Sequence, residues 1–224
     1  MAKQVWRGGN MLYPLPAVMV SCASAAGEKN IVTVAWAGTV CTNPPMLSIS
    51  LRPERHSYGL IRESGEFVVN LVTRRLPRAR GRWGAPPGGL LVPRGPPGPA
   101  RACDWCGVRS GRDYDKWAEC GLTPAPAAKL ELAPAIAESP VSIECRVRDV
   151  LELGSHHLFL ADVAAVQVEE SLLDERGRLD LGRAGLVAYS HGEYLELGRR
   201  LGSFGYSVRK RPERQAGRGS RRRR

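Results

Sequence analysis

The chain has 224 residues, of which 43% are hydrophobic, and this suits one ordinary domain with a real core. Its net charge of +11 is uneven, because residues 209–224 carry +8 and residues 74–101 carry +7, which leaves −4 for the rest. The basic composition therefore does not make the globular part a nucleic-acid binder, and no apolar run reaches the ~18 residues of a membrane span.

The first part of the chain alternates predicted strands with turns. Strands are predicted at 17–24, 31–38, 46–52 and 66–72, where small and β-branched residues dominate. A short helix is predicted over 58–63, with Ser57 as its N-cap and Gly65 at its end. Between the second and third strands, the run Thr42-Asn43-Pro44-Pro45 has two interpretations. It is an ordinary hairpin corner, or a backbone held open so that its amides face a ligand.

The middle of the chain changes character. Residues 76–100 are dominated by Pro, Gly and Arg without periodicity, which predicts a disordered insertion. Order is predicted to resume at Asp104. A short helix is then expected over 112–119, followed by a Pro/Ala-rich connection over 122–137.

The last part of the chain contains the longest strand patterns. Residues 141–153 and 156–169 are separated only by Gly154-Ser155, which predicts a tight hairpin. A last short strand is expected at 185–190, and residues 211–224 are a basic tail predicted to be disordered. Strands in hairpin order with few helices favour an antiparallel barrel or sandwich over a βαβ sheet.

The N-terminal residues and the cysteines bear on where in the cell the protein is found. Lys3 and Arg7 precede an apolar run, as in a signal peptide, but Pro14 and Pro16 interrupt that run and a strand pattern follows without a break. The six cysteines are scattered and do not form a disulfide framework. We therefore expect a cytoplasmic protein with reduced thiols.

The common enzyme motifs are missing from the sequence: there is no G-x-G-x-x-G after a strand, no Walker loop, no H-E-x-x-H and no G-x-S-x-G. Cys103-Asp104-Trp105-Cys106 is a C-x-x-C, but zinc needs two further ligands at a fitting spacing and a thioredoxin-like dithiol needs a βαβ setting. We interpret its cysteines as incidental and predict no metal site. An enzyme is not excluded, because a bound cofactor can carry the reaction while the protein supplies binding and electrostatics.

Six stretches of the chain, in this order, resemble the flavin reductase-like proteins, in particular the flavoredoxin branch. They are PLPAVMVSC, NIVTVAWAGTVCTNPPMLSISL, RHSYGLIRESGEFVVNL, DWCGVRSGRDYDKW, LGSHHLFLADV and YLELGRRLGSFGYSVRK. The resemblance implies a mainly β fold, a six-stranded antiparallel Greek-key split barrel with a few short helices. It also implies a homodimer with FMN near the subunit interface. The domain would span 1–210, interrupted by the insertion.

FMN needs an anion site for its phosphate, and one stretch matches this need. Arg52, Arg55, His56 and Ser57 surround the start of the predicted short helix, where free amides and the helix dipole favour an anion. Ser57 matches the family's hydroxyl at this loop. The alternative is a solvated turn in which the serine only caps the helix.

A flat slot for the flavin ring is assigned to the stretch around the two prolines. Small residues let backbone amides approach a flat ligand, so Thr39, Val40 and Cys41 would present main-chain groups to the ring edge. Asn30 and Trp36 match family positions that touch FMN. The alternative for the tryptophan is a core or interface aromatic.

Three further residues carry over from the family. Lys116 matches a lysine directed at the cofactor, where it would stabilise the charge of reduced flavin, or it is a solvated helix residue. His156 matches a histidine near the flavin and is our candidate for a catalytic residue, although histidines at hairpin starts are more often structural. Because neighbouring strand residues point to opposite faces, only one of His156 and His157 can line the site. Tyr189 matches an aromatic near the ring, or it packs in the core.

The leading hypothesis is an FMN-dependent oxidoreductase that takes electrons from NADH or NADPH. The acceptor would be free flavin, a ferric chelate or a redox protein, and the protein would not associate with membranes. An electron carrier without nicotinamide activity is one alternative, and a barrel without cofactor is another. A nucleic-acid or anionic-surface binder acting through the tail is a third, and would show nonspecific, salt-dependent binding.

Overall fold

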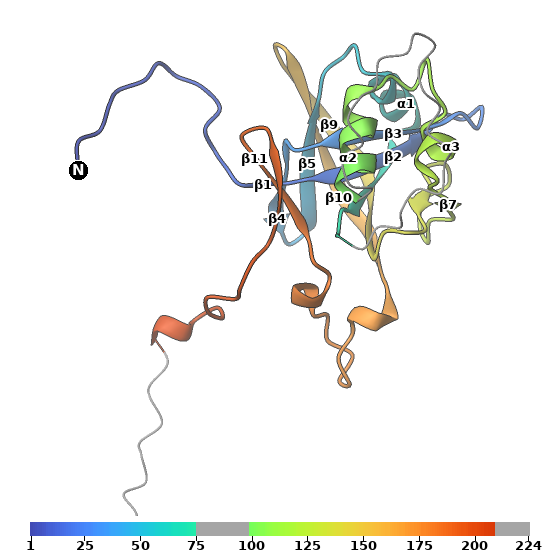
Figure 1. Ribbon diagram of the computed structural model, residues 1–224. Coiled ribbons are helices and arrows are strands. Elements are labelled where there is room, and N and C mark those ends of the chain that lie inside the picture. The colour runs from blue at the N-terminus through green and yellow to red at the C-terminus, as the bar shows by residue number, and fades with distance from the viewer. Residues whose placement is uncertain (75–98, 209–224) are drawn as a thin grey trace, which may run out of the picture.

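The computed structural model describes residues 1–74 and 99–208, and its main feature is a seven-stranded antiparallel sheet (Figure 1). The strand order across the sheet is β3-β2-β6-β9-β10-β5-β4. In chain order these strands are β2 (Val18–Ala23), β3 (Lys29–Val34), β4 (Ala37–Thr42), β5 (Pro45–Leu51), β6 (Glu66–Leu71), β9 (Val141–Leu153) and β10 (His156–Val168).

The sheet closes into a split barrel because its two edge strands, β3 and β4, are joined by only Ala35 and Trp36. The amide of Ala37 donates to the carbonyl of Ala35 at 2.9 Å, and the amide of Ser50 donates to the carbonyl of Trp36 at 2.8 Å. A chain that crosses from one edge of a sheet to the other within two residues forces the edges together. The mainly β, antiparallel split-barrel prediction is confirmed. The strand count differs because the strand predicted over 31–38 breaks at Trp36.

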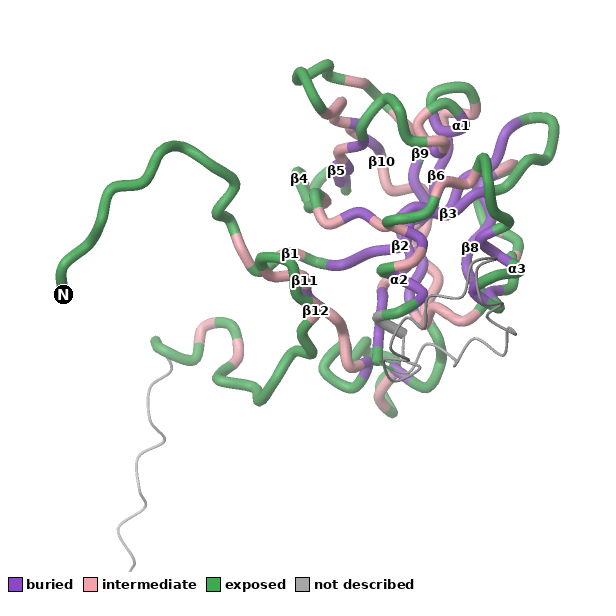
Figure 2. Tube along the Cα trace, turned by 45° about the horizontal axis from the view of Figure 1, so that its top comes forward, coloured by how far each residue is buried: buried purple, intermediate pink, exposed green. Residues whose placement is uncertain are grey.

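Strand β2 is buried along its whole length of six residues (Figure 2). Val18 and Val20 belong to the cluster inside the barrel together with Phe67 and Phe159, whereas Met19 belongs to a second cluster under the helices. Because alternate side chains of a strand point to opposite faces, this strand forms the wall between the two clusters.

Within residues 1–74 and 99–208, three α-helices pack outside the barrel: α1 (His56–Ser64), α2 (Pro99–Val108) and α3 (Lys116–Cys120). Helix α1 ends at Gly65, which is left-handed with φ 69° as predicted, but its N-cap is Arg55 and not Ser57. Order resumes five residues before the predicted position, because α2 already begins at Pro99. Helix α3 starts later than predicted, because the carboxylate of Asp115 accepts hydrogen bonds from the amides of Trp117 and Ala118.

The long hairpin of β9 and β10 matches the prediction except that β10 ends one residue earlier, at Val168, and Gly154 lies in its turn at φ 78°. The predicted connection over 122–137 contains a small ladder, in which β7 (Pro124–Ala125) pairs with β8 (Ala135–Ile136). A third sheet has the order β1-β11-β12. Its strands are β1 (Leu15–Pro16), β11 (Val187–Ser190) and β12 (Glu193–Glu196), and the 3-10 helices are η1 (Glu170–Leu172), η2 (Leu181–Arg183) and η3 (Tyr206–Val208).

The two ends of the described chain extend away from the barrel (Figure 1). They expose large apolar side chains, among them Trp6, Leu12, Leu201 and Phe204. The insertion predicted at 76–100 lies outside the described residues except for the start of α2, and the predicted tail at 211–224 lies outside them entirely. In the described part of the chain, no helix has the length and apolar character needed to cross a membrane.

Candidate functional site

Two cavities adjoin at one end of the barrel, and the walls of both include Val32, Arg52 and Arg55. The first has a volume of about 450 Å³ and the second about 350 Å³. We call the first the aromatic cavity, because its walls include Trp36, His156, Tyr189 and Tyr194. We call the second the basic cavity, because its walls include Arg52, Arg55, Arg109, Arg112 and Lys116. The shared residues make the two cavities one elongated cleft.

The basic cavity is built around the start of α1. Arg55 is the N-cap residue of this helix, so its backbone directly precedes the free amides at the positive end of the helix dipole, and the residue lines the cavity. Arg112 reaches the same loop from the far side, where its Nη1 donates to the carbonyl of Glu54 at 3.0 Å. The carboxylate of Glu54 also lines the cavity, and Arg52 lies 3.5 Å from it. Because the positively charged side chains that line this cavity outnumber its one carboxylate, the cavity is suited to binding an anion.

Ser57 lies in the first turn of α1 with its side chain fully buried. Its hydroxyl oxygen accepts a 2.8 Å hydrogen bond from Nδ2 of Asn30, which is buried in β3. Burial raises the pKa of the neighbouring thiol of Cys22 to about 12, although a hydrogen bond with Ser57 opposes this rise. The structure brings the two predicted site residues Asn30 and Ser57 together, but the serine does not cap the helix.

Gly111 packs against the same asparagine. A Cβ atom at this position would lie 2.3 Å from Oδ1 of Asn30, which is closer than real Cβ contacts. The loop between α2 and α3 can therefore pass this close to β3 only with glycine at this point. This approach brings Arg109 and Arg112 into the wall of the basic cavity.

Lys116 lies in the wall of the basic cavity with its side chain almost fully buried. Its Nζ donates to the carbonyl of Ile31 at 2.8 Å and to the carbonyl of Cys106 at 2.7 Å. Burial lowers the pKa of this lysine. The side chain is thus no solvated helix residue, and it ties α3 both to β3 and to α2.

His56 also lines the basic cavity, but its Nε2 lies 2.7 Å from Oε1 of Glu28. The imidazole is therefore paired with a carboxylate on the loop before β3. Of the residues predicted for the phosphate site, Arg52, Arg55 and Ser57 lie in this cavity together with His56.

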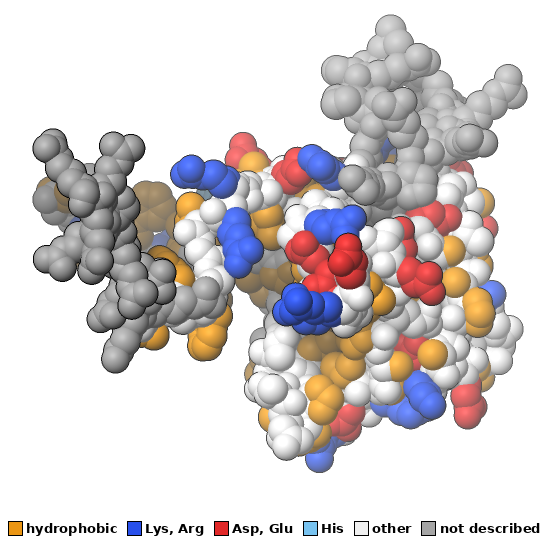
Figure 3. Space-filling model, turned by 90° about the horizontal axis from the view of Figure 1, so that it is seen from below, with side chains coloured by type: hydrophobic (Ala, Val, Ile, Leu, Met, Phe, Trp, Pro, Cys, Tyr) orange, Lys and Arg blue, Asp and Glu red, His pale blue; other side chains and the backbone are white. Residues whose placement is uncertain are grey.

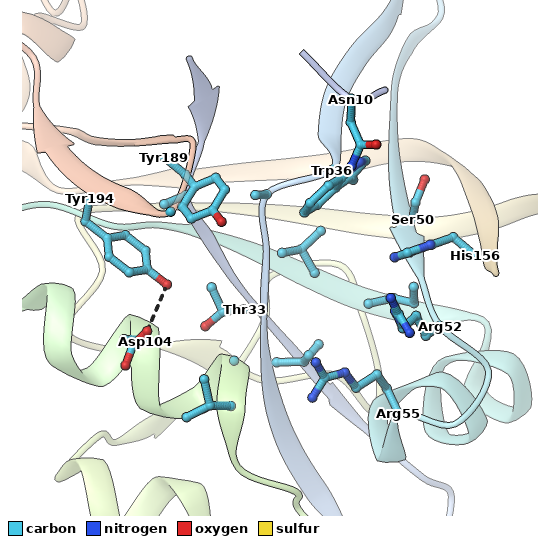
Figure 4. Close-up of a pocket in the computed structure, with 18 residues that line it drawn as sticks. Asn10, Thr33, Trp36, Ser50, Arg52, Arg55, Asp104, His156, Tyr189 and Tyr194 are labelled. Atoms are coloured by element: carbon cyan, nitrogen blue, oxygen red, sulfur yellow. Dashed lines mark hydrogen bonds between the residues drawn. The ribbon is translucent and has the colours of Figure 1, made fainter. Parts of the chain in front are cut away.

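The aromatic cavity contains a stacked ring pair (Figure 4). The rings of Trp36 and His156 are 5.9 Å apart between centroids with an interplanar angle of 24°. Burial lowers the pKa of His156, and the charge of Arg52 lowers it further. Neutral imidazole is therefore the favoured form in the fold.

The other side of the aromatic cavity carries two tyrosines. The rings of Tyr189 and Tyr194 are 5.6 Å apart, and the hydroxyl of Tyr194 lies 3.5 Å from Oδ1 of Asp104 on α2 (Figure 4). Burial raises the pKa of Tyr194, so it is protonated at neutral pH. The cavity therefore has ring faces on both sides.

His157 lies on the opposite face of β10, where its Nδ1 is 2.9 Å from the hydroxyl of Tyr58. Only His156 lines the aromatic cavity, as the alternation of strand residues predicts.

Thr39, Val40 and Cys41 line neither of the two cavities. They belong to β4, which pairs with β5 in a hairpin whose register continues to Thr42 opposite Pro45. The prolines thus mark an ordinary hairpin corner, and the interpretation of a strand held open by them is wrong. The pairing register shifts between Thr39 and Cys41, so β4 bulges at Val40, whose side chain is exposed. The contact of these three residues with a flavin ring stays a prediction.

Sequence reasoning missed several residues of the cleft. They are Thr33, Ser50, Asp104, Arg109, Arg112 and Tyr194. The run Arg109-Ser110-Gly111-Arg112 carried a signal, because two arginines around a glycine are suited to an anion site. Asp104 and Tyr194 carried none, because ninety residues separate them in the chain.

These features define a class of protein. An antiparallel barrel whose cleft joins a basic end to an aromatic end can hold an elongated ligand with an anionic group and a flat ring. The chain belongs to the flavin reductase-like family, in its flavoredoxin branch: the family described as flavin reductase like domain matches residues 10–198.

Several known proteins are similar to this chain. The flavoredoxin of Desulfovibrio vulgaris (Miyazaki F) is 27% identical, with a TM-score of 0.76 over 93% of this chain and 100% of that chain. The flavoredoxin from Methanosarcina acetivorans is 23% identical, with a TM-score of 0.74 over 93% of this chain and 100% of that chain. A protein of Aeropyrum pernix is 32% identical over 192 residues, which are 86% of this chain. The chain spans only 61% of the length of that relative.

Proposed function

We propose that this protein is an FMN-dependent oxidoreductase that passes electrons from NADH or NADPH to free flavin, a ferric chelate or a redox protein. The observation that carries the proposal is the continuity of the cleft. The basic cavity and the aromatic cavity share Val32, Arg52 and Arg55, so one ligand can occupy both. Membership of the flavin reductase-like family supports a flavin as that ligand.

The residues of the cleft fit the three parts of FMN. The phosphate would bind in the basic cavity, where Arg55 and Arg112 approach the start of α1 from two sides. The flat ring would lie in the aromatic cavity, which can accept a planar group between Trp36 and the tyrosines. The ribityl chain would run past Val32 and Arg52, which line both cavities.

When bound, FMN supplies the redox chemistry, since its ring can take up and release electrons. The protein has to bind, orient and shield it. Arg52 and Arg55, which line the aromatic cavity, would stabilise a negative charge on a reduced ring, and Lys116 adds positive charge from the basic cavity. The stack of Trp36 on His156 would exclude water from one side, and neutral His156 keeps a nitrogen able to accept a proton.

We also propose a homodimer. The N-terminal arm, residues 1–12, and residues 197–208 extend away from the barrel over most of their length and expose Trp6, Leu201, Phe204 and Val208 (Figure 1). Exposed apolar side chains of this size favour association with another surface. The arm also reaches the aromatic cavity, because Asn10 lies in its wall. Light scattering after size-exclusion chromatography tests this point, and a monomer at micromolar concentration contradicts it.

The decisive experiment is the visible absorption spectrum of the freshly purified full-length protein. We expect flavin bands and the release of FMN on heating. A preparation that is colourless, and that does not quench the fluorescence of added FMN, contradicts the proposal. Oxidation of NADH and NADPH by the FMN-loaded protein then separates a reductase from an electron carrier without nicotinamide activity.

A further inference from the structure

Two cysteines outside the cleft face each other across the helices α2 and α3. The Sγ atoms of Cys106 and Cys120 are 3.6 Å apart, and both side chains are buried in the cluster under the helices. A disulfide bond has a length of about 2.05 Å, so these sulfurs need to approach by about 1.5 Å to join. Cys103, one helical turn before Cys106, interacts with Thr33 instead.

Cys106 is in contact with both ends of α3. Its carbonyl accepts a hydrogen bond from Nζ of Lys116 at the start of that helix, and its sulfur contacts Cys120 at the end. The helix is one turn long and is therefore fastened to α2 twice by the same residue. A covalent bond between the sulfurs would make one of these two links permanent.

The residues between the two cysteines form much of the wall of the cleft. Gly107 lines the aromatic cavity, and Arg109, Gly111 and Arg112 line the basic cavity. A bond from Cys106 to Cys120 closes a loop around all four of them. Loop closure lowers the entropy of the unfolded chain, so the oxidised fold is expected to resist heat better.

We propose that Cys106 and Cys120 form a reversible intramolecular disulfide that locks α3 onto α2, with a low-molecular-weight disulfide such as oxidised glutathione as the oxidant. The Cys120 thiolate attacks one sulfur of oxidised glutathione and releases one glutathione thiolate. The Cys106 thiolate then attacks the Cys120 sulfur of the mixed disulfide and releases the second. Two electrons pass from the protein to the oxidant, and two protons end on the released thiols.

The order of attack follows from the contact between the sulfurs. A hydrogen bond from Cys106 lowers the pKa of Cys120, and the charge of Lys116 lowers it further. Cys120 is therefore the first of the two to become a thiolate. The hydrogen bond with Cys120 and burial raise the pKa of Cys106, and the first of these causes disappears once Cys120 is bound in the mixed disulfide. Burial also raises the pKa of Cys103 and of Cys145 to about 12.

To test the proposal, the full-length protein is equilibrated in buffers that range from reduced to oxidised glutathione. One set of samples starts from the folded protein, and a second set is refolded from denaturant in the same buffers. The samples are alkylated in denaturant and mapped by mass spectrometry. We expect an oxidised form in which two thiols are protected and a peptide link joins Cys106 to Cys120. The melting temperature of this form should exceed that of the reduced form.

The matched variants are Cys120→Ala, which must lose both the link and the shift in melting temperature, and Cys103→Ala, which must keep both. The proposal is overturned if all six cysteines remain alkylatable at every glutathione ratio, or if the link found involves Cys103. If a variant fails to fold, mapping the disulfide in the unmodified protein still decides whether Cys106 and Cys120 are linked. No readout involves flavin, so the result does not depend on the proposed function.

Discussion

At the scale of the residue, Arg55 has a special position because it lies in the walls of both cavities and caps α1. We predict that Arg55→Ala weakens FMN binding roughly 10- to 100-fold, since a hydrogen bond to a charged group contributes about 1.5–3 kcal/mol. Riboflavin binding should change little, because riboflavin has no phosphate. Quenching of flavin fluorescence measures both affinities.

Arg62→Ala is the matched control for this prediction. Arg62 lies on the same helix, where its guanidinium contacts the hydroxyl of Tyr58 and the carboxylate of Glu152, and it lines neither cavity. Equal loss of FMN and riboflavin affinity in Arg55→Ala would contradict a phosphate contact.

Gly111 gives a second prediction, because only a hydrogen atom fits between its backbone and Asn30. Gly111→Ala should displace Asn30, lengthen its bond to Ser57 and weaken FMN binding at least several-fold. Gly59→Ala on α1 is the control, since its Cβ would meet nothing within 4 Å. Alanine in a helix is favoured over glycine by up to about 1 kcal/mol, so this variant should melt at a higher temperature. A Gly111→Ala protein with unchanged flavin affinity would refute the close packing.

His156 makes stability depend on pH. Its pKa is lowered in the fold below the ordinary value of 6.5, so the unfolded chain binds the proton more readily. The stabilising contribution is therefore present above pH 6.5 and is lost as the pH falls through the pKa of the folded form. Urea unfolding at pH 7.5 and pH 5.5 should show a larger loss in the unmodified protein than in His156→Gln. An equal loss of unfolding free energy in both proteins would contradict the lowered pKa of His156.

The residues of the cleft could be predicted to different degrees. Arg52, Arg55 and Ser57 stand in one short stretch beside a helix start, so local sequence already indicates an anion site. The hydrogen bond between Asn30 and Ser57 and the contact of Tyr194 with Asp104 join distant positions, and no local pattern reveals such pairs. The resemblance pointed to Lys116, which the structure places in the wall of the basic cavity, but its two carbonyl partners follow only from the packing of α2 and β3.

At the scale of the element, predictability depended on turn signals. The hairpin of β9 and β10 was predicted to within one residue because Gly154-Ser155 interrupts two long strand patterns. The break between β3 and β4 was missed because Ala35 and Trp36 carry no turn signal, and a tertiary bond from Ser50 fixes the bend there. Helix α3 was misplaced because several residues before Asp115 are also compatible with a helix start.

The segment between β7 and β8 depends on a buried carboxylate. Glu144, on β9, is fully buried and accepts 2.7 Å hydrogen bonds from the amides of Ala128 and Lys129. Burial alone would raise the pKa of Glu144, but these amides and the side chain of Gln167 outweigh it and lower the pKa. Glu144 is therefore charged when it binds the amides of the segment between β7 and β8.

We predict that Glu144→Gln lowers the free energy of unfolding by about 2 kcal/mol or more at neutral pH, because an amide cannot replace both charge-assisted bonds. The stabilising contribution is present above the ordinary pKa of 4.5 and disappears as the pH falls through the lowered value. The gap between the two proteins should therefore close in acid. Exposed Glu193→Gln is the control in the same urea titrations, and an equal effect there would argue against the buried carboxylate.

At the scale of the whole molecule, positive charge is concentrated in the C-terminal tail and is not spread evenly along the chain. The view in Figure 3 shows lysine and arginine mixed with aspartate and glutamate on that face of the described structure, whereas residues 209–224 carry +8. We predict that a protein truncated after Lys210 keeps its affinity for FMN and loses retention on heparin or DNA at low salt. Flavin titration and salt elution measure the two properties. Loss of flavin binding on truncation would show that the tail belongs to the flavin-binding unit.

The strand order across the barrel also governs how the protein can fold during synthesis. Strands β9 and β10 lie between β6 and β5 in the sheet, although both follow them in the chain. A nascent chain that has left the ribosome only as far as Pro140 holds two separate pieces, β3-β2-β6 and β5-β4, whose inner edges are still unpaired. Unpaired strand edges can pair with other chains, so the emerging polypeptide is most exposed to aggregation until the β9–β10 hairpin joins the two halves.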